Sequence, residues 1–116
     1  MDLFVTRPNH DDVTNFISEW FSPIISDCKT KGINVIDLDG KKANQSQVTS
    51  ILKKTSPRLV VFNGHGSAET IMGYKDEILV KSNSNEEILK QKIVYSLSCN
   101  SAAKLGIDCV NAGTSA

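Results

Sequence analysis

The sequence predicts a three-layer α/β/α fold, in which a mainly parallel sheet of four strands lies between helices. Short apolar runs alternate along the chain with longer segments whose apolar residues recur every three or four positions. This alternation is typical of strand–helix–strand units, which build parallel sheets. One run, residues 59–62, is apolar at every position, which indicates a strand buried on both faces. Because the 116 residues are 40% hydrophobic, we expect a single domain over residues 1–116 with one modest core.

The first strand and the first helix are expected before residue 32. Residues 3–5 are apolar, and Pro8 ends this strand because proline lacks the amide hydrogen that a central strand must donate. From residue 13 to residue 28 the apolar positions form one continuous stripe at helical spacing, which should pack on the sheet. Pro23 should kink or restart this helix, because it removes a backbone hydrogen bond. Gly32 should end it.

The middle of the chain predicts a second strand, a helix and a central strand. Residues 33–38 have the composition of a strand. Asn44 and Gln47 resemble a capping box, and we expect them to open a helix that stops before Pro57. The fully apolar run at residues 59–62 follows as the third strand, at the centre of the sheet.

The second half predicts a small insertion followed by the fourth strand. The apolar runs at residues 71–72 and 78–80 indicate a β-hairpin outside the main sheet. A capping-box pattern at residues 84–87 should open a helix. The apolar run at residues 93–95 supplies the fourth core strand, and a last helix should cover about residues 101–110. Right-handed crossovers are expected between these parallel strands, and the expected strand order is 2-1-3-4.

The end of the chain and the composition set further expectations. Residues 111–116 resemble the start of another strand without its apolar run, so we expect a truncated domain whose open sheet edges pair with a second copy. Thirteen basic and thirteen acidic side chains cancel, which argues against nucleic acid or a membrane surface as partner. No stretch approaches the roughly 18 apolar residues that a membrane span needs.

The three cysteines predict reduced thiols rather than a structural framework. Their number is odd and no C-x-x-C pair occurs, so neither a disulfide framework nor a structural zinc site is expected. This usage, together with the lack of a secretory leader, predicts a cytoplasmic protein without a metal or a cofactor. Cys28 and Cys109 fall among apolar neighbours on predicted helices and should be structural. His10 should lie on the surface at a helix start.

His65 and Cys99 are the candidate catalytic residues. Each follows directly after a predicted strand, and the carboxyl ends of neighbouring parallel strands meet at one edge of a sheet. A thiol attacks a carbonyl as the thiolate, so a cysteine nucleophile needs a nearby imidazole to take its proton. The amides of Gly66 and Cys99 are the expected oxyanion donors. Either residue alone is weak evidence, because buried cysteines and turn histidines are common.

With these residues in view, the chain resembles the caspase-like cysteine peptidases, and most closely their CHAT and gingipain-like prokaryotic members. The resemblance spans roughly residues 58–113. It is carried by VVFNGHG at residues 60–66 and IVYSLSCNSA at residues 93–102. It implies a caspase-like sheet, hydrolysis of a polypeptide substrate through a thioester, Cys99 as nucleophile and His65 as general acid and base.

Residues near the ends of the strands are candidates for recognising the substrate residue before the cleaved bond (P1). Arg7 would favour an acidic P1 residue, whereas Asp11 or Asp12 would favour Lys or Arg. Because Pro8 turns the chain next to Arg7, we expect a basic P1 residue. Asn63 and Ser98, which flank the predicted catalytic loops, are further candidates for contact with substrate.

Two other functions stay open at the level of sequence. A caspase-like domain that has lost catalysis and serves as a binding or scaffolding module would have almost the same sequence. A rhodanese-like sulfurtransferase could curl the amides of residues 99–103 around a persulfide, but it would give His65 no role. A cysteine phosphatase is disfavoured, because position 105, where its phosphate-binding arginine would stand, is Leu105.

Overall fold

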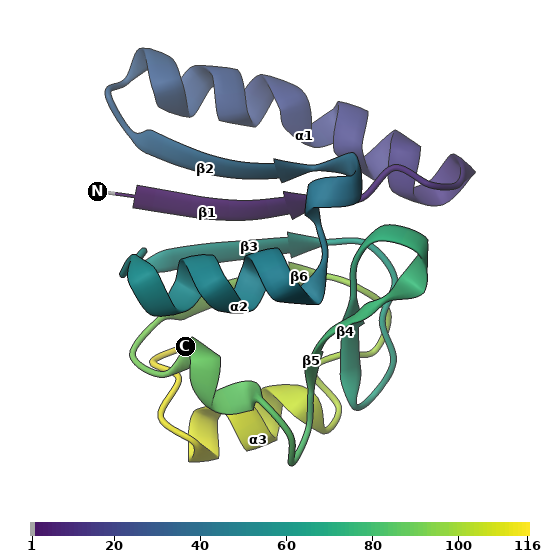
Figure 1. Cartoon of the computed structure of the whole chain (residues 1–116), viewed down its shortest axis with the longest axis vertical. Coiled ribbons are helices and arrows are strands. Elements are labelled where there is room, and N and C mark those ends of the chain that lie inside the picture. The colour runs from purple at the N-terminus through teal and green to yellow at the C-terminus, as the bar shows by residue number, and fades with distance from the viewer. Residues whose placement is uncertain (1) are drawn as a thin grey trace.

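The computed structural model describes residues 2–116, which form a parallel sheet with helices on both faces (Figure 1). In this part of the chain the main sheet has four strands in the order β2-β1-β3-β6, and each neighbouring pair is parallel. The predicted order 2-1-3-4 is therefore confirmed. The strands are β1 (Asp2–Arg7), β2 (Asn34–Asp39), β3 (Leu59–Asn63) and β6 (Ile93–Leu97).

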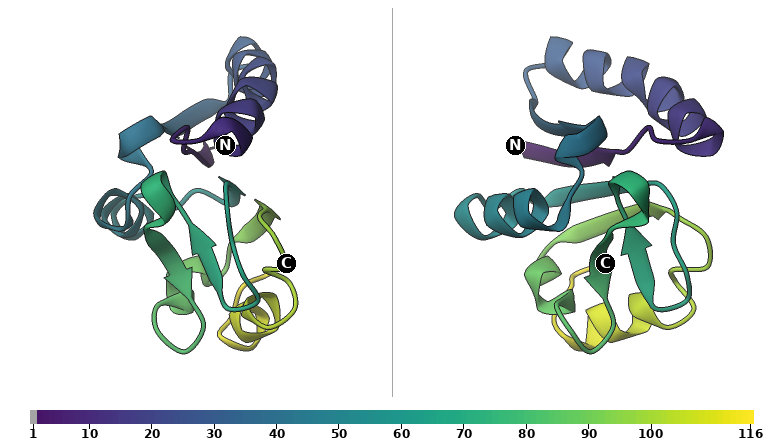
Figure 2. Two further views of the ribbon diagram at one scale, coloured as in Figure 1. Left: turned by 90° about the vertical axis from the view of Figure 1, so that its right-hand side faces the viewer. Right: turned by 45° about the vertical axis from the view of Figure 1, so that its right-hand side comes forward.

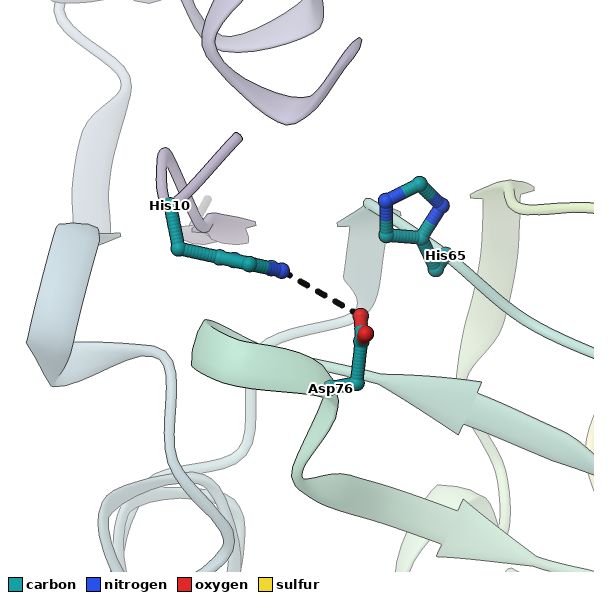
Figure 3. Close-up of side chains that lie close together, drawn as sticks. All are labelled: His10, His65 and Asp76. Carbon is teal, nitrogen blue, oxygen red and sulfur yellow. Dashed lines mark hydrogen bonds and ion pairs between the residues drawn. The ribbon is translucent and has the colours of Figure 1, made fainter. Parts of the chain in front are cut away.

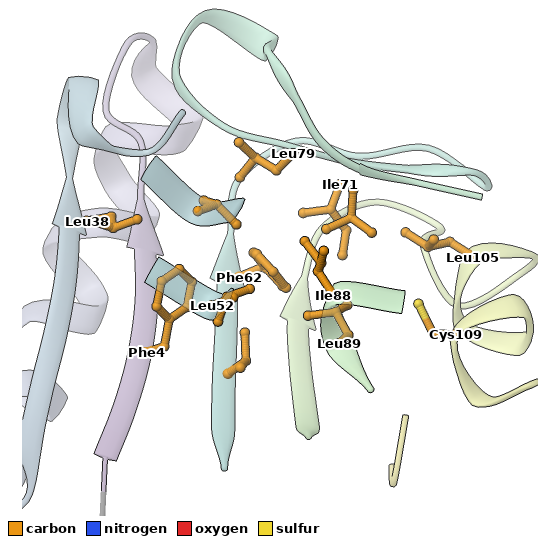
Figure 4. Packing of buried hydrophobic residues seen from close by; sticks show 13 residues of the cluster. Phe4, Leu38, Leu52, Phe62, Ile71, Leu79, Ile88, Leu89, Leu105 and Cys109 are labelled. Carbon is orange, nitrogen blue, oxygen red and sulfur yellow. The ribbon is translucent and has the colours of Figure 1, made fainter. Parts of the chain in front are cut away.

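The two faces of the sheet carry different elements (Figure 2). Helix α1 (Asp12–Thr30) covers one face, where Leu3, Val5 and Val61 of the strands pack against the helix. The other face carries α2 (Gln45–Lys54), the hairpin and α3 (Leu105–Asn111), and it holds the larger apolar cluster (Figure 4). This division follows from the alternation of side chains along a strand, which sends neighbouring residues to opposite faces.

Helix α1 differs from its prediction in two ways. It runs unbroken through Pro23, which is exposed, and on a solvent-facing side water can replace the hydrogen bond that proline removes. Its apolar stripe is also wider than its contact with the sheet. Phe21 and Ile25 are buried, whereas Phe16 and Trp20 are 70% and 60% exposed. The expectation that the whole stripe packs on the sheet is therefore wrong.

The predicted hairpin is confirmed and lies outside the main sheet. Strands β4 (Thr70–Met72) and β5 (Ile78–Lys81) are antiparallel. The start of their turn is docked on the segment before α2: the N–H of Tyr74 donates to the carbonyl of Ala43 at 2.8 Å. A Cβ on Gly73 would lie 2.1 Å from the same carbonyl oxygen, so only glycine permits this approach.

The two helices predicted for the last third are shorter than expected. The segment after the capping-box pattern is a single 3₁₀ turn, Glu86–Leu89, rather than an α-helix. The last helix begins at Leu105 rather than near residue 101. Residues 98–104 form turns instead, because Asn100 has a φ of 59°, a left-handed conformation that a right-handed helix cannot continue.

The final residues run beside the edge strand β6. The N–H of Val94 donates to the carbonyl of Ala116 at 2.9 Å, and the N–H of Ser115 donates to the carbonyl of Lys92 at 2.9 Å. The hydroxyl of Thr114, which is buried, donates to the carbonyl of Leu89 at 3.1 Å. Part of the β6 edge is thus occupied by the chain itself. Within residues 2–116, none of the helices combines the length and the apolar character of a membrane span.

Candidate active site

The structure brings His65 and Cys99 to one cavity at the carboxyl end of the sheet. Strands β3 and β6 are paired so that Asn63 lies opposite Leu97, and both chains leave the sheet directly afterwards. The N–H of Gly64 donates to the carbonyl of Leu97 at 3.2 Å, which ties the two loops together where they diverge. His65 and Cys99 then line the same cavity of about 280 Å³. Cys99 is exposed, so its thiol is open to a substrate.

Gly66 lets the two loops approach more closely than any other residue would. A Cβ at this position would lie 2.8 Å from the Cβ of Ser98 and 3.4 Å from the carbonyl oxygen of Cys99. Real Cβ atoms essentially never come within 3.0 Å of another heavy atom. This one would do so with Ser98 and, at 2.9 Å, with the carbonyl oxygen of Thr70, so a larger residue would push the cysteine loop or the hairpin away. The glycine after His65 is therefore required by packing as well as by any role of its amide.

The amide of Gly66 points away from the hairpin. On either side of it, the N–H of Ser67 donates to Thr70 at 3.0 Å and the carbonyl of His65 accepts from Met72 at 2.9 Å. In an antiparallel pair of this kind, the residue between the two bonds turns its own N–H outward. Among residues 2–116, neither the Gly66 amide nor the Cys99 amide has an acceptor, so both predicted oxyanion donors are free.

Asp11 holds His65 by a hydrogen bond that the sequence did not predict. The Nε2 atom of His65 lies 2.7 Å from the Oδ2 atom of Asp11. The other carboxylate oxygen, Oδ1, caps helix α1 by accepting from the N–H and the hydroxyl of Thr14, each at 2.8 Å. These hydrogen bonds hold the pKa of Asp11 well below its usual range, and the bond from the Thr14 amide has the largest effect.

The charge of Asp11 fixes the tautomer of His65. An ionised carboxylate only accepts hydrogen bonds, so Nε2 of His65 carries a proton and donates it. In the neutral ring, the lone pair is then on Nδ1, which has no partner in the described residues. Asp11 was predicted to bind a basic substrate side chain; in the structure its Oδ2 is hydrogen-bonded to the histidine. Its place as the cap after β1, the strand next to β3, is the signal that could have revealed this contact.

His10 is not the surface residue that the sequence predicted. Its side chain is only 10% exposed, because it packs edge-on against Tyr74, with ring centroids 5.6 Å apart. Its Nε2 atom lies 3.2 Å from Oδ1 of Asp76, and its ring lies 5.9 Å from the ring of His65 (Figure 3). The hairpin turn, which carries Tyr74 and Asp76, buries His10 in a way that no local pattern indicates. His10, His65 and Asp76 are the residues whose donor atoms lie close enough to hold a metal ion.

Arg7 and Asn63 are used inside the protein. The guanidinium of Arg7 makes two hydrogen bonds to Asp37, at 2.7 and 3.0 Å, which raise the pKa of the arginine. It also bonds Ser18 on α1, so it joins β1, β2 and α1. Asn63 is buried, and its Nδ2 donates to the carbonyl of Thr6 at 3.2 Å. Neither side chain lines the cavity beside Cys99.

The cavity beside Cys99 is mostly apolar. Ser98, a predicted substrate contact, does line it, and its hydroxyl bonds those of Ser96 and Ser101. Asp12 is the exposed first residue of α1 and does not line it. The full lining consists of Val13, Ile17, Gly64, His65, Ser96, Leu97, Ser98 and Cys99. None of these residues is a carboxylate that would attract a lysine or arginine side chain.

The other two cysteines lie away from the cavity. Cys109 is buried in the larger apolar cluster, and this burial raises the pKa of its thiol to about 11. Cys28 is half-buried and packs against the cluster under α1. The cavity that Cys109 lines contains no histidine, and neither cysteine lines the cavity beside His65. No protein-family model, no curated protein and no solved structure matches the chain.

Proposed function

We propose that the protein is a caspase-like cysteine peptidase in which Cys99, His65 and Asp11 act together. The observation that carries the proposal is the convergence of an exposed thiol and an imidazole on one cavity, with a carboxylate bonded to Nε2 of that imidazole. Asp11 leaves the lone pair of His65 on Nδ1, and in the proposed reaction this lone pair accepts the proton of the thiol. A structural histidine would not need a free ring nitrogen beside a cysteine.

The reaction follows from these positions. The lone pair on Nδ1 of His65 takes the proton of Cys99, and the sulfur attacks the substrate carbonyl. The amides of Gly66 and Cys99 stabilise the negative charge on the carbonyl oxygen. When the carbon–nitrogen bond breaks, His65 returns its proton to the leaving amine, and a thioester remains on Cys99. Water, deprotonated by His65, then hydrolyses the thioester and restores the thiol.

The lining of the cavity favours an uncharged, apolar P1 residue. Val13, Ile17 and Leu97 form its apolar walls, whereas the carboxylate of Asp11 is bonded to His65 and Thr14. The basic P1 preference expected from the sequence would have to rest on Asp12, outside this cavity. A positional-scanning peptide library distinguishes the two, because cleavage after Leu or Met supports the apolar pocket and cleavage after Lys or Arg contradicts it.

Covalent labelling tests the proposed activity. The intact chain is treated with a peptidyl acyloxymethyl ketone that carries an apolar P1 residue, and the modified cysteine is identified by mass spectrometry. We expect label on Cys99, none on Cys28 or Cys109, and loss of labelling in His65→Ala. If iodoacetamide alkylates Cys99 while the peptidyl reagent leaves it untouched, the peptidase proposal fails.

One observation favours a non-catalytic binding module as the second candidate. No hydrogen bond joins the sulfur of Cys99 to His65 in the described residues. Catalytic hydrogen bonds often form only with substrate in place, so this gap does not exclude a peptidase. A binding module predicts that a peptide ligand binds with equal affinity to the wild-type protein and to Cys99→Ala, with no turnover by either.

A further inference from the structure

Both histidines of the chain meet at one point beside the candidate active site. The sequence contains two, His10 and His65, and their ring centroids lie 5.9 Å apart. They come from different loops, since His10 follows β1 and His65 follows β3. Asp76, from the hairpin turn, completes the group (Figure 3). One donor atom from each of the three side chains lies within 4.8 Å of the donor atoms of the other two.

We propose that His10, His65 and Asp76 bind a divalent transition-metal ion, with zinc as the ion that best suits these ligands. Two imidazole nitrogens and one carboxylate oxygen form a typical ligand set for zinc, with a fourth position left open. In a tetrahedral zinc site, ligand atoms that each lie roughly 2.1 Å from the ion are about 3.4 Å apart. The three side chains therefore need only small rotations to close on an ion.

His10 is held in place by packing, whereas Asp76, whose side chain is 55% exposed, has only its backbone fixed. The side chain of His10 is 10% exposed and is fixed by Tyr74, and its Nδ1 is buried without a hydrogen-bond partner in the described residues. Asp76 belongs to the turn that Gly73 docks against the carbonyl of Ala43, and it has a φ of 60°. A site whose ligands are already positioned loses less conformational entropy when an ion binds.

The charge around the three ligands also suits a divalent cation. The Oδ2 atom of Asp11 lies 2.7 Å from Nε2 of His65 and 3.6 Å from Nε2 of His10. Together with Asp76, it places two carboxylates around two imidazoles. Neutral imidazoles are the form that binds metal, so the two carboxylates would balance the two positive charges of the ion.

If the proposed peptidase activity holds, an ion at this site blocks it. A neutral imidazole has one lone pair and one N–H proton. When Nε2 of His65 gives its lone pair to the metal, the remaining proton resides on Nδ1, the nitrogen that takes the thiol proton in the proposed reaction. The ring then has no lone pair for the proton of Cys99. Removal of the ion restores the Asp11–His65 hydrogen bond and the free Nδ1.

Nuclear magnetic resonance of the histidine rings tests the site directly, with zinc chloride as the probe and the intact chain as the sample. Because the chain has two histidines, long-range proton–nitrogen spectra show both rings separately. We expect both rings to respond together and to saturate at one equivalent of zinc. Asp76→Asn should weaken binding by at least roughly tenfold, as loss of even an outer-shell partner does. Asp27→Asn, an exposed carboxylate on α1 paired with Lys31, should leave binding unchanged.

Three results would overturn the proposal. The first is a response of His65 without His10. The second is a cobalt complex with a thiolate charge-transfer band that disappears in Cys99→Ser, which would place the metal between His65 and Cys99. The third is no binding at millimolar zinc. Because the rings are read without turnover, zinc binding by a protein that cleaves nothing would overturn the peptidase proposal alone and leave the metal site intact.

Discussion

Asp11 acts in two directions, because one carboxylate oxygen caps helix α1 and the other holds His65. Asp11→Asn separates these tasks. Asparagine is as good a cap as aspartate, since its Oδ1 still accepts from Thr14. Its Nδ2, however, donates to Nε2 of His65, which drives the ring proton to Nδ1. We expect kcat/KM to fall by roughly 100-fold or more while α1 stays capped and the protein stays folded, the size of a general-base contribution. Asp12→Asn is the matched control, and equal losses in both variants would argue against the role of Asp11.

The thiols of Cys99 and Cys109 should differ in their response to pH. Burial raises the pKa of Cys109 to about 11, so its reactive thiolate is scarce at neutral pH and increases only as the pH approaches that value. We expect iodoacetamide to modify the exposed Cys99 at pH 8 and to modify Cys109 only in strongly alkaline solution. Mass spectrometry of digests across a pH series measures this. Rapid modification of Cys109 at pH 8 would show that α3 opens readily.

Local patterns in the sequence predicted the residues that stand directly after strands. They did not predict contacts that depend on how loops and helices dock. His65, Gly66 and Cys99 follow predicted strands, so topology alone places them together. The role of Asp11 requires a contact 54 positions along the chain. The burial of His10 requires one 66 positions away, to Asp76. Such contacts depend on how the hairpin and α1 dock, which no periodicity encodes.

At the scale of elements, two glycines offer a matched test of the loop contact. Gly66→Ala places a Cβ 2.8 Å from Ser98, and we expect a loss of roughly 1–3 kcal/mol in the free energy of unfolding, typical of overpacking. Gly106→Ala lies inside α3 with its nearest neighbours at 3.7 Å, and should gain about 0.5–1 kcal/mol through helix propensity. Urea denaturation measures both. If Gly66→Ala left the free energy of unfolding unchanged, the cysteine loop would have to move aside at little cost.

Strands and helices were predicted well where one sequence pattern is present. They were predicted poorly where helical spacing coincides with a residue that favours a kink or a turn. The runs at β1, β3 and β6 have no rival interpretation, and all three form strands of the main sheet. Helix α1 was expected to break at Pro23, but its packing through Phe21 and Ile25 spans the proline. The last helix was expected too early, because apolar content at residues 101–104 did not reveal the left-handed turn at Asn100.

At the scale of the whole molecule, α1 leaves part of its face of the sheet uncovered, and large apolar side chains are exposed there and on the helix. Tyr95 on β6 is 56% exposed, and Trp20 on α1 is 60% exposed. Because edge strands and apolar patches favour association, we expect the protein to self-associate at high concentration. Tyr95→Lys should shift the sedimentation coefficient toward the monomer, whereas Lys29→Glu, on the exposed surface of α1, should not. A monomer at every concentration would contradict this expectation.

The shared carboxylate of Asp11 has a thermodynamic consequence for the molecule. Fraying of the first turn of α1 and release of the His65 ring are linked, since the two oxygens of one carboxylate make both sets of hydrogen bonds. A ligand that binds better to the oriented ring of His65 must therefore stabilise the first turn of α1. By reciprocity, a change that stabilises this turn must raise the affinity for the ligand. Amide hydrogen exchange at Thr14 measures this linkage. The exchange should be slower when a covalent inhibitor is bound to Cys99 than when it is absent.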